Sequence, residues 1–424
     1  MAGAAFSSAV SLFMMKYYTY IFLPADFGIL SLYLIMFKYV SAFASLNLDS
    51  GSVRFYFDYK YNRRDEYLST IFWLITFTSM VVLILGIFFK DPISNWISLN
   101  SQDIYLITLF TGVVAVYASF LTRVLYNENK SSLVLKHTIF QTFINHTSSV
   151  IFVSVFHLNV FGRIAGQGLG YLLNTITLIN DLSKKKLFNI KLVFNKGMAK
   201  ETFMLTLPSM ISMFLGVAFI YVDRFFLKHY MGDTAVGIYT LGYLLGQGLS
   251  VVYEAISQAV LPKVYSDMNN NYEEAKNELE RFSYKYYIGL VIITVIISLL
   301  SPIMVAIFSN DNYAQSAVVM PFIMTGFMMG GFYKIPSLIL GFHKVVWFYP
   351  MLSIFSFGIN ALLNWWLIPI YGMVGSAFAS FLSIFLYSLY LQYRASSYFS
   401  VKNNIFTFFL YVFVFIIILG VFYG

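Results

Sequence analysis

A small set of charged side chains interrupts the long apolar stretches of this 424-residue chain. Lysine and arginine attract phosphate oxygens, and a lone carboxylate can bind a proton or a metal cation. If these stretches cross a bilayer, each charge costs roughly 2.5–3.5 kcal/mol at its centre. Such residues therefore face a cavity, form pairs or reach the membrane surface. They are Lys16, Lys38, Arg123, Asp223, Arg224, Glu254 and Lys334.

Lys38 is the most deeply placed of these cations. It lies about eleven residues from the outer end of the stretch 27–47, or roughly 16 Å at 1.5 Å per residue. A lysine stem of about 6 Å reaches neither surface from there. We expect Lys38 to line a central cavity and attract phosphate. The alternatives are that Lys38 forms a buried ion pair, or that the membrane-spanning stretch is wrongly placed in the sequence. Lys16 and Lys334 lie nearer the ends of their stretches. Each of them either reaches the membrane surface or lines the cavity.

Arg123 lies near the inner end of its stretch, where contact with lipid headgroups competes with contact to a substrate phosphate. Arg163 lies near the outer end of another stretch, and the same two contacts are open to it. Glu254 is the only carboxylate deep in any stretch, so it is paired or is protonated for part of the time. We expect it to bind H+ or Na+ as a coupling residue, with a structural pair to Lys334 or Lys38 as the alternative.

Asp223 and Arg224 are neighbours near the outer end of the stretch 203–228. Adjacent opposite charges in an apolar stretch favour a local ion pair, or a contact between two halves of the protein that fixes the register of the helix, which we call an interlobe latch. A gate on the outer side of the membrane is the alternative.

The composition is that of an integral membrane protein. Hydrophobic residues make up 59% and charged residues 11%, whereas soluble domains are about 25% charged. The mean hydropathy is +0.73. Apolar runs such as 71–89 and 288–308 can cross a hydrocarbon core about 30 Å thick as helices. A barrel would show alternating segments of about ten residues, so we predict an all-α polytopic fold.

The sequence offers little for cofactor or covalent chemistry. The chain has no cysteine, which excludes thiolate metal sites, and its five histidines are scattered. No nucleophilic triad or phosphate-binding loop is recognisable. The glycines within 162–170 lie in an apolar stretch, where small residues favour close helix packing over nucleotide binding. We therefore expect no enzyme, no metal, no cofactor and no nucleic-acid partner.

The apolar pattern predicts thirteen membrane-spanning helices, two sets of six and one more, without a cleavable signal. Nineteen lysines and arginines fall in the loops on one side, and two, Lys90 and Lys228, in the loops on the other. The positive-inside rule then places the N-terminus in the cytoplasm. The predicted spans are 4–22, 27–47, 67–89, 103–126, 134–156, 158–180, 203–228, 235–261, 285–308, 313–341, 347–369, 372–393 and 404–422.

Two short patterns repeat about 209 positions apart. Phe-Gly-Ile-Leu-Ser-Leu-Tyr around Gly28 matches Val-Gly-Ile-Tyr-Thr-Leu around Gly237, and Val-Phe-Gly ending at Gly162 matches Ile-Tyr-Gly ending at Gly372. The first helix of each copy runs from inside to outside, so the repeats are parallel. We predict an N-terminal six-helix lobe at 1–185, a cytoplasmic linker at 186–202, a C-terminal six-helix lobe at 203–395 and an extra transmembrane helix at 396–424.

Several motifs occur in a characteristic order. Leu-Pro-Ser-Met at 207–210 begins a helix that ends in Asp223-Arg224; Val-Gly-Ile-Tyr follows at 236–239, Leu-Pro-Lys at 261–263 and a glycine-rich turn at 369–377. In this order the chain resembles the polysaccharide-repeat-unit flippases of O-antigen (Wzx) type, in the multidrug/oligosaccharidyl-lipid/polysaccharide exporter superfamily. The resemblance covers essentially the whole chain and departs from the family in the thirteenth span.

The resemblance implies two lobes in a MATE-like V, alternating access, and an undecaprenyl-pyrophosphate-linked oligosaccharide as the substrate. That substrate would cross the bacterial cytoplasmic membrane for the synthesis of O-antigen, capsule or exopolysaccharide, with a polymerase, a chain-length regulator and membrane lipids as partners. A cation-coupled multidrug exporter is an alternative, although among the deep carboxylates only Glu254 fits it and Lys38 argues against it. A membrane-embedded polymerase would need a larger outside loop than 90–102.

Overall fold

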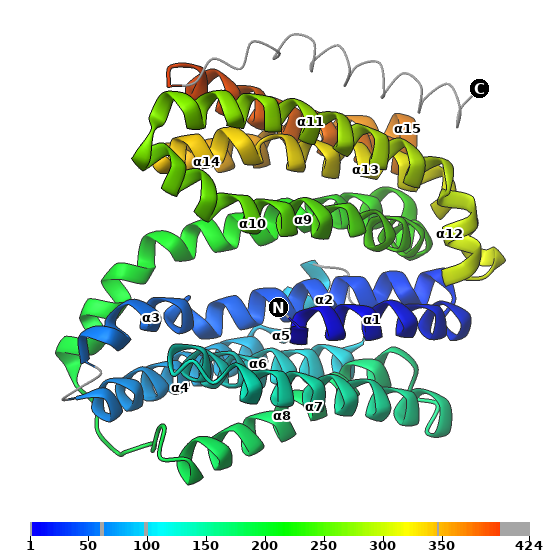
Figure 1. The fold of residues 1–424 in the computed structure, drawn as a ribbon. Helices are drawn as coiled ribbons and strands as arrows, with labels where there is room; N and C mark the ends of the chain where they lie inside the picture. The colour runs from blue at the N-terminus through cyan, green and yellow to red at the C-terminus, as the bar shows by residue number, and fades with distance from the viewer. Residues whose placement is uncertain (1, 60–62, 97–100, 346, 399–424) are drawn as a thin grey trace. The chain divides into compact units, whose positions relative to one another are not determined.

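The fold is helical throughout the residues that the computed structural model describes, which are 2–59, 63–96, 101–345 and 347–398 (Figure 1). No strand occurs among these residues, which confirms the prediction of an all-α polytopic fold. The thirteenth span, predicted at 404–422 as the extra C-terminal helix, lies outside the described residues.

Packing divides the chain into two compact units. Unit 1 comprises Met1–Phe22 and Ile29–Tyr221, and unit 2 comprises Leu23–Gly28 and Val222–Gly424. The division falls inside a long helix, downstream of the linker predicted at 186–202. The lobe boundaries along the sequence stay a prediction.

Unit 1 is a bundle in which α8 packs against α6 and α7, while α1 packs against α7 and α4 against α6. Two short helices, α3 and α5, are additional to the predicted spans. One turn of π-helix, Ile151–Val155, ends α7. The helices are α1 (Ala2–Ile21), α2 (Pro24–Ser45), α3 (Leu48–Tyr59), α4 (Arg64–Phe88), α5 (Lys90–Trp96), α6 (Gln102–Asn127), α7 (Ser131–Val150), α8 (Asn159–Lys184) and the first part of α9 (Lys196–Gly246).

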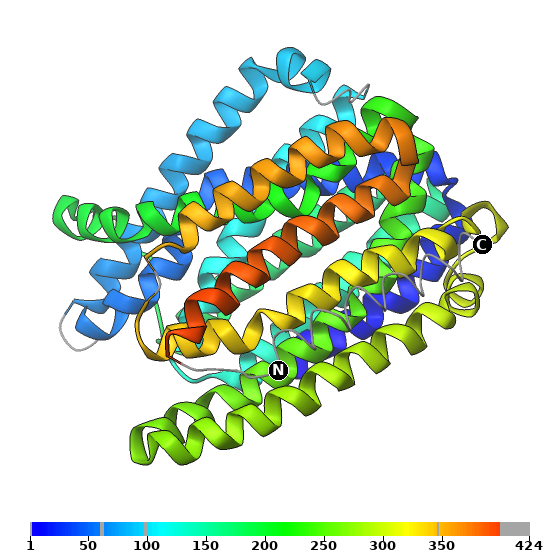
Figure 2. The ribbon, with the colours of Figure 1, turned by 90° about the horizontal axis from the view of Figure 1, so that it is seen from above.

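Unit 2 is built around α13, which packs against α11 and α15. The helical run of α9 is broken at Gly232 (φ 81°) and that of α15 at Gly372 (φ 57°), where a positive φ favours glycine. Figure 2 shows the two halves of α15 running back beside each other. The remaining helices are α10 (Gly248–Asn270), α11 (Tyr272–Leu299), α12 (Ser301–Phe308), a 3-10 turn (Asp311–Tyr313), α13 (Ser316–Phe332), α14 (Lys334–Phe342) and α15 (Tyr349–Ser396).

Seven helical stretches among the described residues are long and apolar enough to cross a membrane. As a single rod, the 48 residues of α15 would be about 72 Å long, far more than a hydrocarbon core of about 30 Å. The break at Gly372 therefore makes α15 two crossings, as Gly232 does for the stretch Met213–Asn270. The polar residues of α8 keep it outside this group of seven. The count of thirteen spans stays a prediction.

The two repeated glycines lie against each other in unit 2. A Cβ atom on Gly28 would overlap the carbonyl oxygen of Asp233 and lie 3.0 Å from the amide nitrogen of Gly237. A Cβ atom on Gly237 would overlap the carbonyl oxygen of Pro24 and lie 3.0 Å from the amide nitrogen of Gly28. Pro24 precedes Gly28 by the same interval as Asp233 precedes Gly237, so the contact is reciprocal and leaves room only for glycine.

The glycines of α8 bring it close to α7. A Cβ atom on Gly166 would overlap Ser149, and one on Gly170 would lie 3.0 Å from the Cα and Cβ atoms of Asn145. These residues pack helix against helix, as small residues do within membranes. The structure therefore gives the glycine-rich stretch a packing role.

Candidate functional site

Lys38 lies on α2 in unit 1, and its side chain is exposed while most neighbouring residues of the helix are buried. By the helical rise it is about 21 Å from the start of α2 and about 10 Å from its end. Its Nζ lies 5.8 Å from the centroid of the Phe37 ring. Within the described part of the chain it has no ion-pair partner, so the alternative of a buried pair finds no support. Its role in lining a cavity stays a prediction.

Lys16 and Arg123 are the other two predicted cations in unit 1. The side chain of Lys16 is exposed on α1, and that of Arg123 is exposed on α6. Arg123 donates a long hydrogen bond from Nη2 to the Ser50 Oγ, at 3.4 Å. Neither residue has a carboxylate partner among the described residues, so both stay open to an external anion.

Glu254 on α10 and Lys334 on α14 form an ion pair in unit 2. Their side chains are 47% and 20% exposed, so the carboxylate keeps contact with its surroundings. The Lys334 Nζ also lies 5.6 Å from the ring centroid of Tyr253 and 5.4 Å from that of Tyr333. A structural pair with Lys334 was the alternative that the sequence analysis gave for Glu254. The ion-coupling role of Glu254 stays a prediction.

Asp223 and Arg224 on α9 pair with each other in the core of unit 2. The Arg224 Nη1 lies 2.7 and 2.9 Å from the two carboxylate oxygens, and both side chains are almost fully buried. The guanidinium carbon lies 4.1 Å from the ring centroid of Tyr243 and 5.2 Å from that of Tyr239. The local pair is observed, whereas a latch or gate role stays a prediction.

A chain of buried polar groups continues from this pair. The Tyr239 hydroxyl lies beside Asp223 and Ser376, and Ser376 donates to Asn364 at 2.8 Å. Asn364 donates in turn to Asn360 at 3.0 Å. The chain ties both halves of α15 to α9. Sequence reasoning missed it, although the two asparagines lie four residues apart, which places them on one face of an apolar helix.

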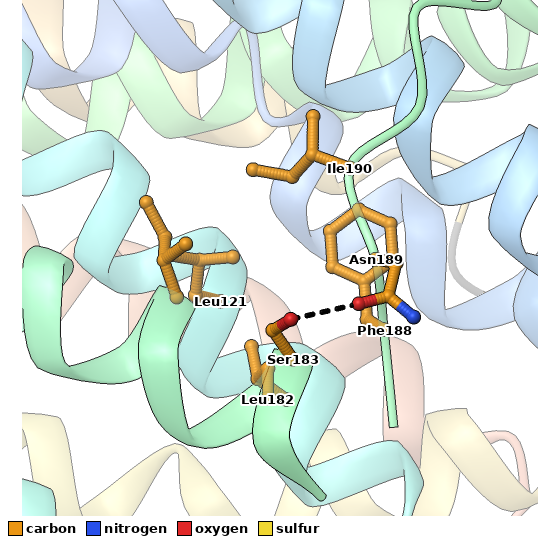
Figure 3. A pocket seen from close by; sticks show the side chains of 7 residues that line it. Leu121, Leu182, Ser183, Phe188, Asn189 and Ile190 are labelled. Atoms are coloured by element: carbon orange, nitrogen blue, oxygen red, sulfur yellow. Dashed lines mark hydrogen bonds between the residues drawn. The ribbon is translucent and has the colours of Figure 1, made fainter. Parts of the chain in front are cut away.

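A cavity of about 220 Å³ lies in unit 1 beneath the irregular segment that follows α8. In Figure 3, Ser183 points across it toward Asn189, with 2.9 Å between the Ser183 Oγ and the Asn189 Oδ1. Its lining is mostly apolar and holds none of the predicted site residues. The lining residues are Leu121, Ile179, Leu182, Ser183, Phe188, Asn189 and Ile190.

Comparison with known proteins agrees with the architecture. Residues 2–269 match the family described as "Polysaccharide biosynthesis protein". The capsular polysaccharide biosynthesis protein CapF of Staphylococcus aureus is 27% identical over 390 residues, covering 88% of this chain and 91% of that protein.

Solved structures of low sequence identity share the fold. An inward-facing multidrug resistance MATE transporter of the MOP superfamily aligns with a TM-score of 0.76 at 13% identity, over 94% of this chain and 96% of that one. The lipid II flippase MurJ in an inward closed conformation aligns with a TM-score of 0.74 at 16% identity, over 100% and 98%. These likenesses confirm the MATE-like architecture expected from the motifs.

Proposed function

Since the chain belongs to the polysaccharide biosynthesis protein family, we propose that it is a flippase for an undecaprenyl-pyrophosphate-linked oligosaccharide. The substrate would cross the bacterial cytoplasmic membrane by alternating access and supply O-antigen, capsule or exopolysaccharide. Family membership and the helical fold make it a multi-pass membrane protein of polysaccharide biosynthesis. The lipid-linked substrate, the direction of transport and the membrane are parts of the proposal.

The observation that carries the proposal is Lys38. A pyrophosphate group crossing an apolar medium needs a compensating charge, because Coulomb attraction strengthens as the local dielectric constant falls. Lys38 offers such a charge inside the apolar helix α2, with no carboxylate of the described residues to neutralise it. Lys16 and Arg123 would add attraction along unit 1, and Lys334 would do so only when it leaves Glu254.

Within this proposal Glu254 couples transport to H+ or Na+. Protonation or cation binding would loosen its pair with Lys334, since the lysine would then lose its counter-charge. The Asp223–Arg224 pair would hold the register of α9 or gate the outer side. A polymerase and a chain-length regulator would receive the product, and the protein itself would carry out no covalent chemistry.

Complementation tests the proposal. In a deletion strain, the Lys38→Ala variant should reach the membrane at normal levels and yield about tenfold less surface polysaccharide or none, a change of about 1.4 kcal/mol or more. Lys38→Arg should restore part of the yield, because it keeps the charge. The exposed Lys185→Gln serves as the matched control and should behave as wild type.

Normal polymer from Lys38→Ala would remove this residue from the proposal. The flipping of a fluorescent lipid-linked oligosaccharide in proteoliposomes would then decide whether the protein moves that substrate at all.

Export of cationic drugs is a second candidate function. The half-exposed Glu254 favours it, because a carboxylate that reaches its surroundings can attract a cation. Its ion pair with Lys334 weakens that attraction. Loss of drug resistance in the deletion strain, with surface polysaccharide unchanged, would support the exporter and contradict the flippase.

A further inference from the structure

Arg163 of unit 1 is a cation without a counter-charge among the described residues. It lies on α8, is half-buried, and forms no ion pair with any described residue. Its Nη1 donates to the Asn145 Oδ1 at 3.1 Å and to the Ser149 Oγ at 3.4 Å, and both acceptors are neutral. A charge in a low-dielectric site is costly unless it is compensated.

Two buried polar groups beside Arg163 also lack partners. The Tyr18 hydroxyl of α1 has no hydrogen bond of normal geometry, although Ser149 lies near it, and Tyr18 is 5% exposed. The Nδ1 of His146 on α7 has none either, and His146 is 8% exposed. An unsatisfied buried polar group costs about 1–3 kcal/mol, so two of them together indicate a missing ligand.

These groups converge from three helices. The Arg163 guanidinium carbon lies 5.0 Å from the centroid of the Tyr18 ring, and the rings of Tyr18 and His146 are 6.4 Å apart. A tyrosine hydroxyl, a histidine N–H and the remaining guanidinium N–H groups are all hydrogen-bond donors. Water would satisfy the two orphan groups, but the arginine charge would then be compensated only by its contact with the face of the Tyr18 ring.

We propose that Arg163, Tyr18 and His146 form an internal binding site for a small inorganic anion in unit 1. An anion accepts hydrogen bonds from all three groups and neutralises the guanidinium. The site is confined, because Gly166 and Gly170 hold α8 close against α7 at Ser149 and Asn145.

Thermal unfolding tests the site on the full chain in nanodiscs of zwitterionic lipid. The buffers would contain sodium chloride, sodium phosphate or sodium gluconate at equal ionic strength. At tenfold excess over Kd, a bound anion stabilises the folded protein by about 1.4 kcal/mol, which for a chain of 424 residues should raise the Tm by about 1.5–2 °C relative to gluconate. Arg163→Gln keeps a polar group beside Asn145 but removes the charge, so the rise should disappear.

Two further variants separate this site from the other cations. Lys185→Gln should keep the full rise in Tm, because Lys185 is exposed and lies at the opposite end of α8 from Arg163. Tyr18→Phe removes one hydroxyl and should weaken the apparent affinity severalfold, which keeps the test decisive if Arg163→Gln does not fold.

Equal Tm values of the wild-type protein in all three salts would overturn the proposal. So would a full rise in Arg163→Gln, or an unchanged anion affinity in Tyr18→Phe. Because no lipid-linked substrate is used, these outcomes are independent of whether the protein is a flippase.

Discussion

The two units treat charge in opposite ways within their apolar helices. In unit 1, Lys38 and Arg163 have no carboxylate partner among the described residues. In unit 2, the charges that the sequence singled out occur as pairs. A pair is neutral at long range, whereas a lone cation attracts any anion that comes near it. The pairs of unit 2 are Asp223 with Arg224 and Glu254 with Lys334.

The difference teaches that the two stretches related by the predicted repeat share glycines but not charges. At the offset of the repeat, Lys38 corresponds to Gln247 and Glu254 to Ser45. The buried pair Asp223-Arg224 corresponds to Met14-Met15, two apolar residues. The singled-out cations of unit 1 therefore lack carboxylate partners among the described residues, whereas those of unit 2 are paired within the unit.

The largest expected effect comes from breaking the buried pair of unit 2. Arg224→Met would leave Asp223 charged and unpartnered in the core, at a cost of about 3–5 kcal/mol. We expect low yield and a greatly lowered Tm in detergent. The double variant Asp223→Asn/Arg224→Met removes both charges and should recover at least half of the loss. A single variant as stable as wild type would mean that the pair contributes nothing.

The next effect comes from giving unit 1 a pair like those of unit 2. Leu34→Glu places a carboxylate four residues before Lys38, on the same face of α2, which favours an ion pair. We expect the protein to reach the membrane, and surface polysaccharide to fall about tenfold, equivalent to about 1.4 kcal/mol. Leu34→Gln is the matched control and should stay near wild type. Undiminished polymer from Leu34→Glu would show that Lys38 need not be unpaired.

The smallest effect concerns the half-exposed pair of unit 2. Glu254→Gln and Lys334→Met should each lower the free energy of unfolding by no more than about 1 kcal/mol, because exposed ion pairs contribute little. A double-mutant cycle on Tm would measure the coupling directly. A cost above that of breaking the Asp223–Arg224 pair would reverse the order of the two sites.

Much of the fold could be predicted from the sequence because bilayer thickness limits the choice. Long apolar runs separated by charged loops predict helices, and twelve of the thirteen predicted spans fall on helices of the described residues. The break at Gly232 falls between two predicted spans, and the break at Gly372 falls on the first residue of the predicted span 372–393; at both, glycine permits a positive φ. The short helices α3 and α5 were missed, because neither is apolar enough to read as a span.

The candidate site was less predictable. Depth along a helix identified Lys38 and Glu254, but only the folded chain shows that Glu254 meets Lys334 and that Lys38 meets no carboxylate among the described residues. From the sequence we expected Arg163 to contact lipid headgroups, because it lies close enough to the end of its helix to reach the membrane surface. Its neighbour Tyr18 lies on α1, 145 residues earlier in the sequence, and His146 lies on α7, the helix before α8. No spacing rule connects the three residues.

Because Gly28 and Gly237 pack reciprocally, the same steric constraint limits the residue type at both positions. A methyl group at either would collide with backbone of the other copy, while Gly216 and Gly358 have open space at the same point. A backbone shift that makes room for a side chain at one position does not make room at the other, because the second glycine still lies against a backbone carbonyl oxygen. A side chain at either position therefore requires the backbone around the other to move, so the two matching motifs share one steric constraint.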